Sequence, residues 1–291
     1  MKSRWLLNLF MLLAVGGIAA FIYLRPQPVD TETKRHVISG LAPSSFSRLT
    51  IAHPTKPPTT LEKQNGNWLL LEPFKARADA DVVESVLAIA TAISLHKFPA
   101  SKAAQYGLDN PRLKVNIDNE NFSFGMYNPL TGEQYVGYKD AIYLVSPIYS
   151  ESASVKSEEF IARNPIAVGE TLAGFDFSHL EQWESSRLNL DYTDDKWKVS
   201  IADAKPDQKE LDNWFSSQWQ KIAAKSVEPY KPDGNPHPWF AVKLKSGKTI
   251  HFDKLQENPE LLIARPDEGM IYHFPQDVGF TLLNPPVGLI K

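Results

Sequence analysis

The chain begins with a long apolar run, and stretches of alternating apolar and polar residues follow it. The run Trp5–Leu24 contains no charged residue and is apolar on every face of a helix. At about 1.5 Å of rise per residue, such a helix can cross the roughly 30 Å hydrocarbon layer of a membrane. Trp5 and Tyr23 stand near its ends, where aromatic rings prefer the headgroup layer. The pattern predicts a transmembrane anchor over residues 1–25, bounded by Trp5 and Leu24.

Two other interpretations of this run compete with an anchor. A cleaved secretory signal usually has a shorter apolar region that ends at small residues, and Gly17, Ala19 and Ala20 are small. The apolar run continues through Phe21–Leu24, however, where a polar cleavage region should begin. A buried core helix fits less well, because the run opens the chain and has no polar face. We therefore expect an uncleaved signal-anchor.

The charges beside the run predict its orientation. Lys2 and Arg4 precede it, whereas Arg25 is followed by the acidic residues Asp30 and Glu32. An excess of basic residues marks the cytoplasmic side, so we expect a cytoplasmic N-terminus. No later stretch resembles a second span, which predicts a single-pass protein of the bacterial inner membrane with periplasmic C-terminal domains. The proline- and charge-rich stretch 26–40 is expected to be a linker, and the rigid turns of Pro26 and Pro28 would hold the folded part off the membrane. A structured role for this stretch is an alternative without positive support.

A similar pattern occurs twice along the rest of the chain. Leu61–Trp68 and Leu190–Trp197 each place a polar turn before a tryptophan that opens an apolar strand, 129 positions apart. A segment with helical spacing follows each of these strands. Asp79 or Asp81 is the expected N-terminal cap of the first helix, and Asp207 is the expected cap of the second. The helical positions are Val82, Val86, Ile89 and Ile93 in the first segment and Leu211, Phe215, Trp219 and Ile222 in the second.

The remaining strands of the two patterns also correspond. Residues 111–117 alternate like 238–244, and further short strands are expected over 122–124 and 142–145, and over 250–252 and 271–274. We predict an α+β fold with two tandem repeats, 41–165 and 166–291, each a mostly antiparallel sheet covered by one main helix. Any two α+β domains share some of these features, but the conserved order and the paired tryptophans favour duplication. Trp68 and Trp197 are expected to be core residues.

Composition narrows the classes of function. The 31 basic and 34 acidic residues give a net charge of −3, which argues against a nucleic-acid binder. The absence of cysteine excludes disulfides, thiolate metal sites and a thiol nucleophile. The seven histidines form no H-x-x-x-H or H-x-H pair, and no G-x-S-x-G or phosphate-binding loop is present. We therefore predict no catalytic, metal-binding or cofactor-binding residues, and no cofactor.

One polar loop is a candidate functional segment: Tyr106, Gly107, Leu108, Asp109 and Pro111. Its backbone amides could hold a ligand. A structural interpretation is also available, because Gly107 allows a positive φ, Asp109 favours a turn and Pro111 suits the start of an edge strand. We favour the structural interpretation.

Three segments together resemble a known family. Asn65–Trp68, Ala78-Asp79 and the Tyr106–Pro111 loop before an alternating strand form a pattern similar to that of the uncharacterised bacterial envelope family catalogued as domain of unknown function 4340. The resemblance covers most of 45–150 and, more weakly, 180–285. It implies a membrane-anchored protein without an established activity, and some members of the family occur beside components of gliding-type ABC transporters.

These observations lead to three hypotheses about function. The first is a non-enzymatic, membrane-anchored periplasmic accessory or scaffold protein of an envelope complex, with an envelope protein as partner and an ABC transporter as one such complex. The alternative is a module that binds a small ligand or cell-wall glycan through aromatic residues. The second alternative is a hydrolase whose two carboxylates meet only in the folded chain.

Overall fold

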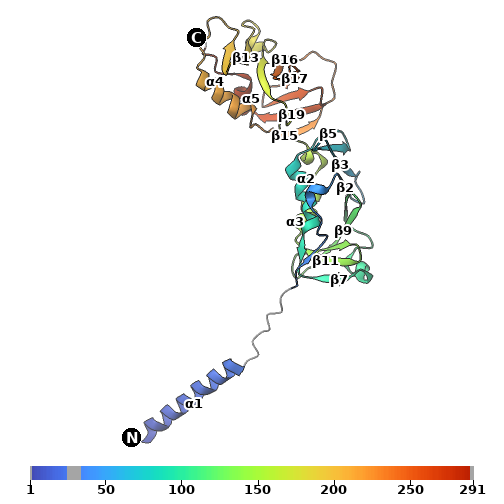
Figure 1. Cartoon of the computed structure of the whole chain (residues 1–291), viewed down its shortest axis with the longest axis vertical. Helices are drawn as coiled ribbons and strands as arrows, with labels where there is room; N and C mark the ends of the chain where they lie inside the picture. Colours follow the sequence, from blue (N-terminus) through green and yellow to red (C-terminus); the bar gives the residue numbers. More distant parts are fainter. Residues whose placement is uncertain (1, 25–33, 289–291) are drawn as a thin grey trace.

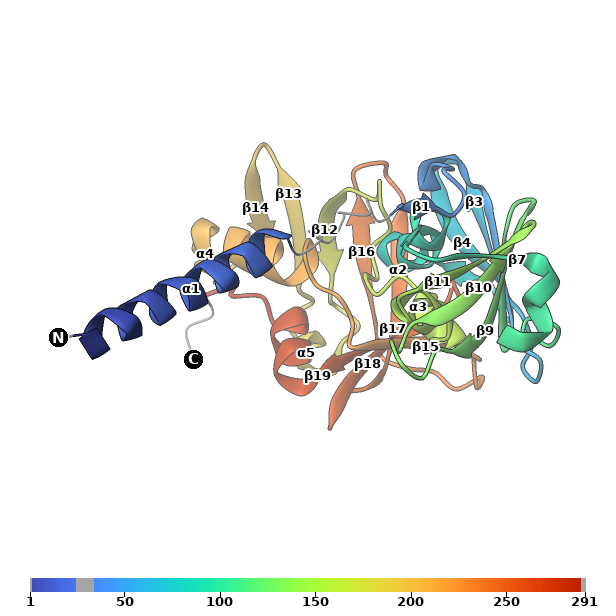
Figure 2. The same ribbon diagram turned by 90° about the horizontal axis from the view of Figure 1, so that it is seen from below.

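The computed structural model describes residues 2–24 and 34–288 and contains two large antiparallel sheets (Figure 1). We call the nine-stranded sheet with the helices packed on it the first unit, and the eight-stranded sheet with its helices the second unit. The two units lie end to end in Figure 1 and are seen from below in Figure 2. The protein is therefore of mixed α+β class, with few helices.

The first unit contains strands β2–β5 and β7–β11, and a short ribbon of β1 and β6 lies beside them. The strands are β1 (His36–Val37), β2 (Arg48–Ala52), β3 (Thr59–Gln64), β4 (Asn67–Glu72), β5 (Ala76–Arg77), β6 (Ile93–Ser94), β7 (Lys97–Pro99), β8 (Leu113–Ile117), β9 (Glu120–Tyr127), β10 (Gln134–Tyr138) and β11 (Ala141–Val145). The helices are α2 (Ala80–Leu87), α3 (Ile148–Ala153) and the 3₁₀ segments η1 (Pro43–Ser45), η2 (Ala88–Thr91), η3 (Ala100–Tyr106) and η4 (Ser157–Phe160).

The second unit has a similar organisation but fewer short helical segments between its strands. Its strands are β12 (Leu172–Asp176), β13 (Asn189–Thr193), β14 (Lys196–Val199), β15 (Ser226–Pro229), β16 (Trp239–Leu244), β17 (Thr249–Gln256), β18 (Glu260–Arg265) and β19 (Met270–Pro275). Its helices are α4 (Gln208–Trp214), α5 (Gln276–Leu283), the 3₁₀ segment η5 (Glu181–Trp183) and the π-helical segment η6 (Phe215–Trp219).

Eight strands of each sheet follow the same order. In the first sheet the order is β4-β3-β2-β8-β9-β10-β11-β7, and in the second it is β14-β13-β12-β16-β17-β18-β19-β15. The first sheet has one additional edge strand, β5. Two-residue turns close the equivalent hairpins β3–β4 and β13–β14, and both central residues of each turn have positive φ. These turns are Asn65-Gly66 and Asp194-Asp195.

Several details of each unit differ from the pattern predicted from sequence. The prediction missed strands in both units: β2, β5, β7 and β10 of the first sheet with the ribbon strands β1 and β6, and β12, β15 and β18 of the second sheet. Because β2 pairs with β8, the strand that follows Pro111 is central in the sheet and not at its edge. Ile93 belongs to β6 and not to the preceding helix, which ends earlier as η2. Two α-helices accompany each sheet where one was expected.

The N-terminal segment contains one long helix, α1 (Lys2–Leu24). The backbones of Trp5 and Leu24 lie in it, but their side chains are outside the described residues. Among the residues that the structure describes, we find no helix whose length and apolar character suffice for crossing a membrane. The linker predicted over 26–40 lies partly outside the described residues, and in its described end β1 pairs with β6 and Ile38 is buried.

The two cores differ in composition. Both contain aliphatic and aromatic side chains, but the second is richer in aromatic rings, and four of its residues are buried tryptophans. The Phe175 ring centroid lies 5.1 Å from that of Trp214 and 4.8 Å from that of Trp219. Trp68 and Trp197 are both buried in the second position of equivalent strands, so the prediction that they are core residues is confirmed.

Candidate functional site

A network of charged side chains joins the two units. Arg77, at the end of β5, donates from Nε to Glu268 Oε1 at 2.7 Å and from Nη2 to Glu268 Oε2 at 3.0 Å. The same Nη2 donates to the backbone oxygen of Asn164 and to the Tyr272 hydroxyl. Glu268 precedes β19, and Tyr272 lies within it, so one guanidinium from the first unit is held by the second. The bidentate geometry fixes its orientation as well as its position.

A second arginine completes this network from the other side. Arg265, at the end of β18, is only 3% exposed. Its guanidinium donates to both carboxylate oxygens of Glu170, at 2.7 and 2.9 Å, and to the backbone oxygen of Pro165. It also pairs with Asp267. Glu170 and Pro165 belong to the segment that connects the units, so this buried cation binds the connection to the second sheet.

The network shifts the pKa values of its members. Burial alone would raise the pKa of Glu170. Hydrogen bonds from Arg265 and from the Ala167 backbone N–H lower it by more than burial raises it, so the carboxyl has a pKa below its usual value. Burial is also the main reason that the pKa of the Tyr272 hydroxyl is raised, and the Glu268 carboxylate adds to that effect. Glu170 is thus held ionised and Tyr272 protonated, as a network of complementary donors and acceptors requires.

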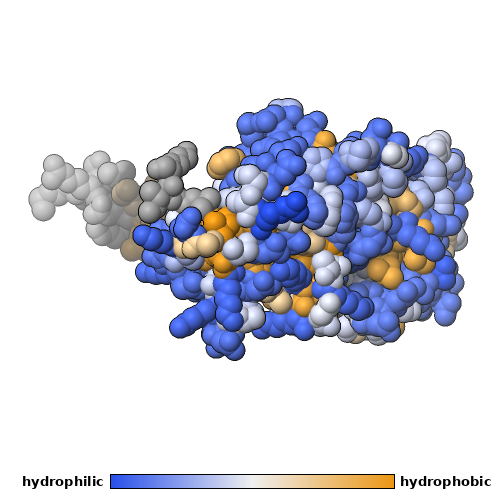
Figure 3. Space-filling model, turned by 90° about the horizontal axis from the view of Figure 1, so that it is seen from above, coloured by the Kyte–Doolittle hydropathy of each residue, from blue (hydrophilic) through white to orange (hydrophobic). Residues whose placement is uncertain are grey.

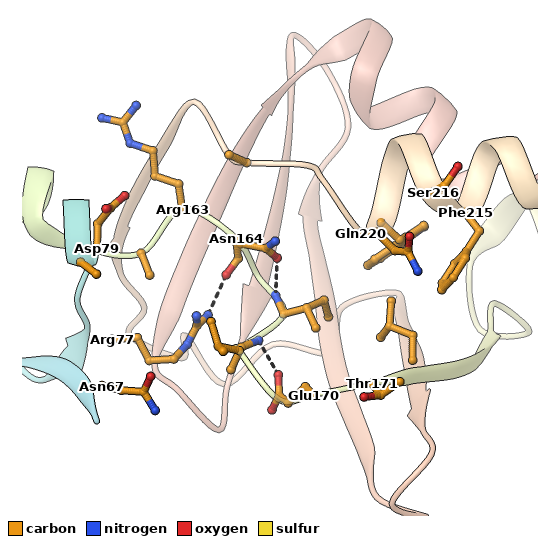
Figure 4. Close-up of a pocket in the computed structure, with 18 of the residues that line it drawn as sticks. Asn67, Arg77, Asp79, Arg163, Asn164, Glu170, Thr171, Phe215, Ser216 and Gln220 are labelled. Atoms are coloured by element: carbon orange, nitrogen blue, oxygen red, sulfur yellow. Dashed lines mark hydrogen bonds between the residues drawn. The ribbon is translucent and has the colours of Figure 1, made fainter. Parts of the chain in front are cut away.

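An open groove lies next to this network, between the two units. Its volume is about 940 Å³. The first unit contributes the β3–β4 turn, β5 and the start of α2, and the second contributes β13, α4 and η6. Residues of the connecting segment 162–172 line it between them. Figure 4 shows Asn67, Arg77 and Asp79 on one side and Phe215, Ser216 and Gln220 on the other.

The wall from the second unit has an unusual backbone. After α4 the helix continues as the π-helical segment η6, which supplies Phe215, Ser216 and Trp219 to the groove. π-helical turns are rare, and they occur frequently at functional sites. Trp219 is completely buried and donates from Nε1 to the Leu282 backbone oxygen at 3.2 Å, which ties this wall to the end of α5.

The carboxylates that line the groove have hydrogen-bond partners. Asp79 caps α2 by accepting from the backbone N–H groups of Asp81 and Val82, as the sequence predicts. Asp212 accepts from Trp197 Nε1 at 2.9 Å. Glu170 is paired with Arg265, and its pKa is lowered. A general acid in hydrolysis needs a raised pKa, so the environment of Glu170 does not suit that role.

The predicted functional loop lies elsewhere, at the end of the first unit that carries β7 and η3. Gly107 ends η3 with a φ of +69°, the left-handed geometry expected of it. The Tyr106 ring stacks on Tyr135, with centroids 4.1 Å apart. Asp109 is exposed, and Pro111 stands just before β8. None of these residues lines the groove.

Two glycines explain how this loop packs on the sheet. A Cβ on Gly125 of β9 would lie 2.1 Å from the Tyr106 backbone oxygen and 3.1 Å from Leu108 Cδ2. A Cβ on Gly137 of β10 would lie 3.4 Å from Leu108 Cδ1. Leu108 therefore fills the space that these glycines leave, which supports the structural interpretation of the loop.

Sequence reasoning missed the charged residues that join the units. Arg77 and Glu268 are 191 positions apart, and no motif relates them. The one sequence feature that could have pointed to these residues is an arginine at the end of each of two strands, Arg77 in β5 and Arg265 in β18. Ser94 and Lys97 also have the S-x-x-K spacing of some serine hydrolases. Ser94 Oγ is buried and donates to the backbone oxygen of Leu144 at 2.7 Å, so it serves the fold.

No metal site emerges from the side chains that the structure describes, since no three His, Asp or Glu residues there are placed to share an ion. The family model of the domain of unknown function DUF4340 matches residues 68–231, which is more than half of the chain. The chain belongs to the DUF4340 family. Searches of the curated proteins and of the solved structures gave no match.

The extent of the match differs from the resemblance expected in each repeat. A single DUF4340 segment runs from Trp68 in the first unit to Lys231 in the second. It contains the Tyr106–Pro111 loop, the connecting segment and both α2 and η6. Most residues that line the groove of this DUF4340 protein therefore lie inside the family segment, whereas Arg265 and Glu268 lie outside it.

Proposed function

We propose that this DUF4340 protein is a non-enzymatic, membrane-anchored accessory or scaffold protein of a bacterial envelope complex, and that its partner binds in the groove between the units. The groove itself carries the proposal. It combines residues from both units and a π-helical wall, and buried charge pairs hold its sides in place. A preformed surface of this kind can bind without the cost of ordering its walls.

The helix α1 supports the proposed anchor. In its central part, residues 10–21, large apolar side chains are exposed. They are Phe10, Met11, Leu12, Leu13, Val15, Ile18 and Phe21. The uncharged run Trp5–Leu24 extends this apolar surface in both directions. We propose that it inserts into the bacterial inner membrane and places both units in the periplasm.

Alkaline carbonate extraction of membranes tests the anchor. We expect the full-length protein to stay with the membrane pellet, and a variant with Leu13→Arg and Ala14→Arg to be released, because two charges in the apolar run are costly in a bilayer. Release of the unaltered protein would refute the anchor.

Site-specific photocrosslinking in cells tests the groove. A photoreactive phenylalanine analogue at Gln220 or Asn213, which are exposed in the groove, should give a discrete larger product. The same analogue at Asn235, an exposed residue outside the groove, is the matched control. Equal products at all three positions, or none at Gln220 and Asn213, would contradict binding in the groove. Components of an ABC transporter are the partners to identify first in the product.

A second candidate function is favoured by the chemistry of the groove lining. Half-buried Tyr192 and Phe215 stand there together with the amides of Asn67, Asn213 and Gln220, a combination that suits a glycan or small polar ligand. Thermal-shift measurements with cell-wall fragments test it. A ligand at 100 times its Kd should stabilise the protein by about 2.7 kcal/mol. Phe215→Ala should abolish the shift, and a shift that persists in this variant would place the ligand elsewhere.

A further inference from the structure

The β1–β6 ribbon presents apolar side chains to the outside. Val37 and Ile93 are paired directly across the ribbon, so their side chains share one face. Leu95 follows β6 directly, in a bend. These three residues are 52%, 53% and 50% exposed. The opposite face carries Ile38 and Ser94, which are buried. A surface sheet normally turns its polar residues outward, but this ribbon turns Ser94 inward and Val37 and Ile93 outward, and exposed Leu95 follows in the adjacent bend.

Hydrogen bonds hold the ribbon in this orientation. Ile38 N–H donates to the Ala92 backbone oxygen at 3.0 Å, next to the ladder between β1 and β6. Ser94 Oγ donates to the backbone oxygen of Leu144 and accepts from its N–H, at 2.7 and 3.1 Å. A rotation that buried Ile93 and Leu95 would break the bonds of Ser94, so the outward apolar face belongs to the folded state.

The ribbon lies where the chain enters the first unit. The described part of that unit begins at residue 34, at the end that points away from the second unit, near β7 (Figure 1). Residues 25–35 separate α1 from β1. Since an extended chain spans at most about 3.6 Å per residue, this connection keeps the ribbon within about 45 Å of the end of α1.

Basic residues flank both strands of the ribbon in the sequence. The segments 34–61 and 85–108, which contain β1 and β6, include no aspartate or glutamate. The basic residues nearest to β1 and β6 in the sequence are Lys34, Arg35 and Lys97, and the acidic residues Asp30 and Glu32 precede the first of these segments. Seen from above, by contrast, the body is largely hydrophilic, and its apolar residues show in small groups among polar ones (Figure 3). An apolar face edged with basic residues is typical of surfaces that bind the headgroup layer of anionic membranes.

We propose that the outer face of the β1–β6 ribbon lies against the surface of an anionic phospholipid bilayer, with Val37, Ile93 and Leu95 in the headgroup layer. This inference depends on the proposed anchor, because α1 supplies the high local concentration that three side chains need for stable contact. The first unit is then oriented on the membrane, and the groove between the units points away from the bilayer.

The absence of cysteine allows a direct test on the full-length chain. Single variants Leu95→Cys and Val168→Cys, labelled with an environment-sensitive fluorophore, are reconstituted into vesicles of phosphatidylcholine and phosphatidylglycerol. Val168 is the control, because it is 91% exposed and lies in the segment between the units. We expect the label at 95 to emit at shorter wavelength and to be quenched by spin-labelled lipid several-fold more than the label at 168.

Vesicle flotation separates the two proposals. If the protein floats with the vesicles and the label at 95 is quenched no more than the label at 168, the ribbon does not touch lipid and the inference is overturned, while the anchor stands. If the protein does not float, both proposals fail. Vesicles of phosphatidylcholine alone should reduce the quenching at 95, and equal quenching in both lipids would refute the role of the basic residues.

Discussion

The two units share a strand order but reach it with different cores. In the first, α2 continues into the tight 3₁₀ segment η2, where Ala88 and Ala90 stand. In the second, α4 continues into the wide π-helical segment η6 between Phe215 and Trp219. Small side chains let the first helix tighten against its sheet, whereas the second accommodates buried aromatic rings. The same order of strands thus accommodates different core side chains, and the helical segments that follow α2 and α4 differ with them.

The largest expected effect comes from releasing the connecting segment from the second unit. Arg265→Met should destabilise the protein by about 3–5 kcal/mol, because it leaves the half-buried Glu170 carboxylate without its cationic partner. Urea denaturation measures the change. Arg163→Met is the control, since its ion pair with Glu159 is exposed and should contribute less than about 1 kcal/mol. Similar losses in both variants would show that the buried pair has no special role.

The second largest loss of stability is expected from substitutions in the aromatic part of the second unit's core. Trp219→Phe removes the indole N–H that donates to the Leu282 backbone oxygen and leaves a small cavity, at a cost of about 2–3 kcal/mol. Phe122→Leu in the first core is a matched reduction in size without a hydrogen bond, and it should cost less. A larger loss for Phe122→Leu would contradict the importance of the indole contact.

Acid should weaken the junction between the units. The pKa of Glu170 is lowered in the folded state, so its charge contributes stability above its ordinary pKa of about 4.3, and this contribution is lost as the pH falls through the lowered value. We expect Glu170→Gln to be less stable than the unaltered protein at pH 7, and the difference to shrink towards pH 3. A constant difference over this range would show that ionisation of Glu170 does not contribute.

The smallest expected effect concerns the equivalent hairpin turns. The second unit places Asp195 at a φ of +57°, where the first unit has Gly66. Asp195→Gly should therefore stabilise the protein by about 0.5–1 kcal/mol, and Gly66→Asp should destabilise it by a similar amount. Thermal unfolding of both variants measures the two changes. Changes of the same sign would mean that the turns are not equivalent.

The sequence was most informative where local chemistry decides the structure. Trp68 and Trp197 open equivalent strands, and Asp79 and Asp207 cap the helices that follow, because each residue acts on its immediate neighbours. It was less informative for short strands such as β7, whose pairing depends on a partner far along the chain. Without β2, the central place of β8 was hidden as well.

The groove was beyond prediction for a similar reason. Its walls come from both units, and their relative position depends on pairs such as Arg77 with Glu268, which share no local pattern. The Tyr106–Pro111 loop is conspicuous in the sequence because its chemistry is local. Its glycine and leucine serve the packing of one sheet, far from the groove.

The crowding of indoles in the second unit has a practical consequence. Trp183, Trp214 and Trp219 donate to three successive backbone oxygens at the end of α5, those of Leu283, Thr281 and Leu282. Ultraviolet-excited emission therefore comes mostly from one half of the molecule, and it should change when that end of α5 detaches. Tryptophan fluorescence can therefore follow the unfolding of the second unit, and a dye on a cysteine introduced into the first unit can follow the unfolding of that unit. Comparison of the two signals shows whether the units unfold in one transition.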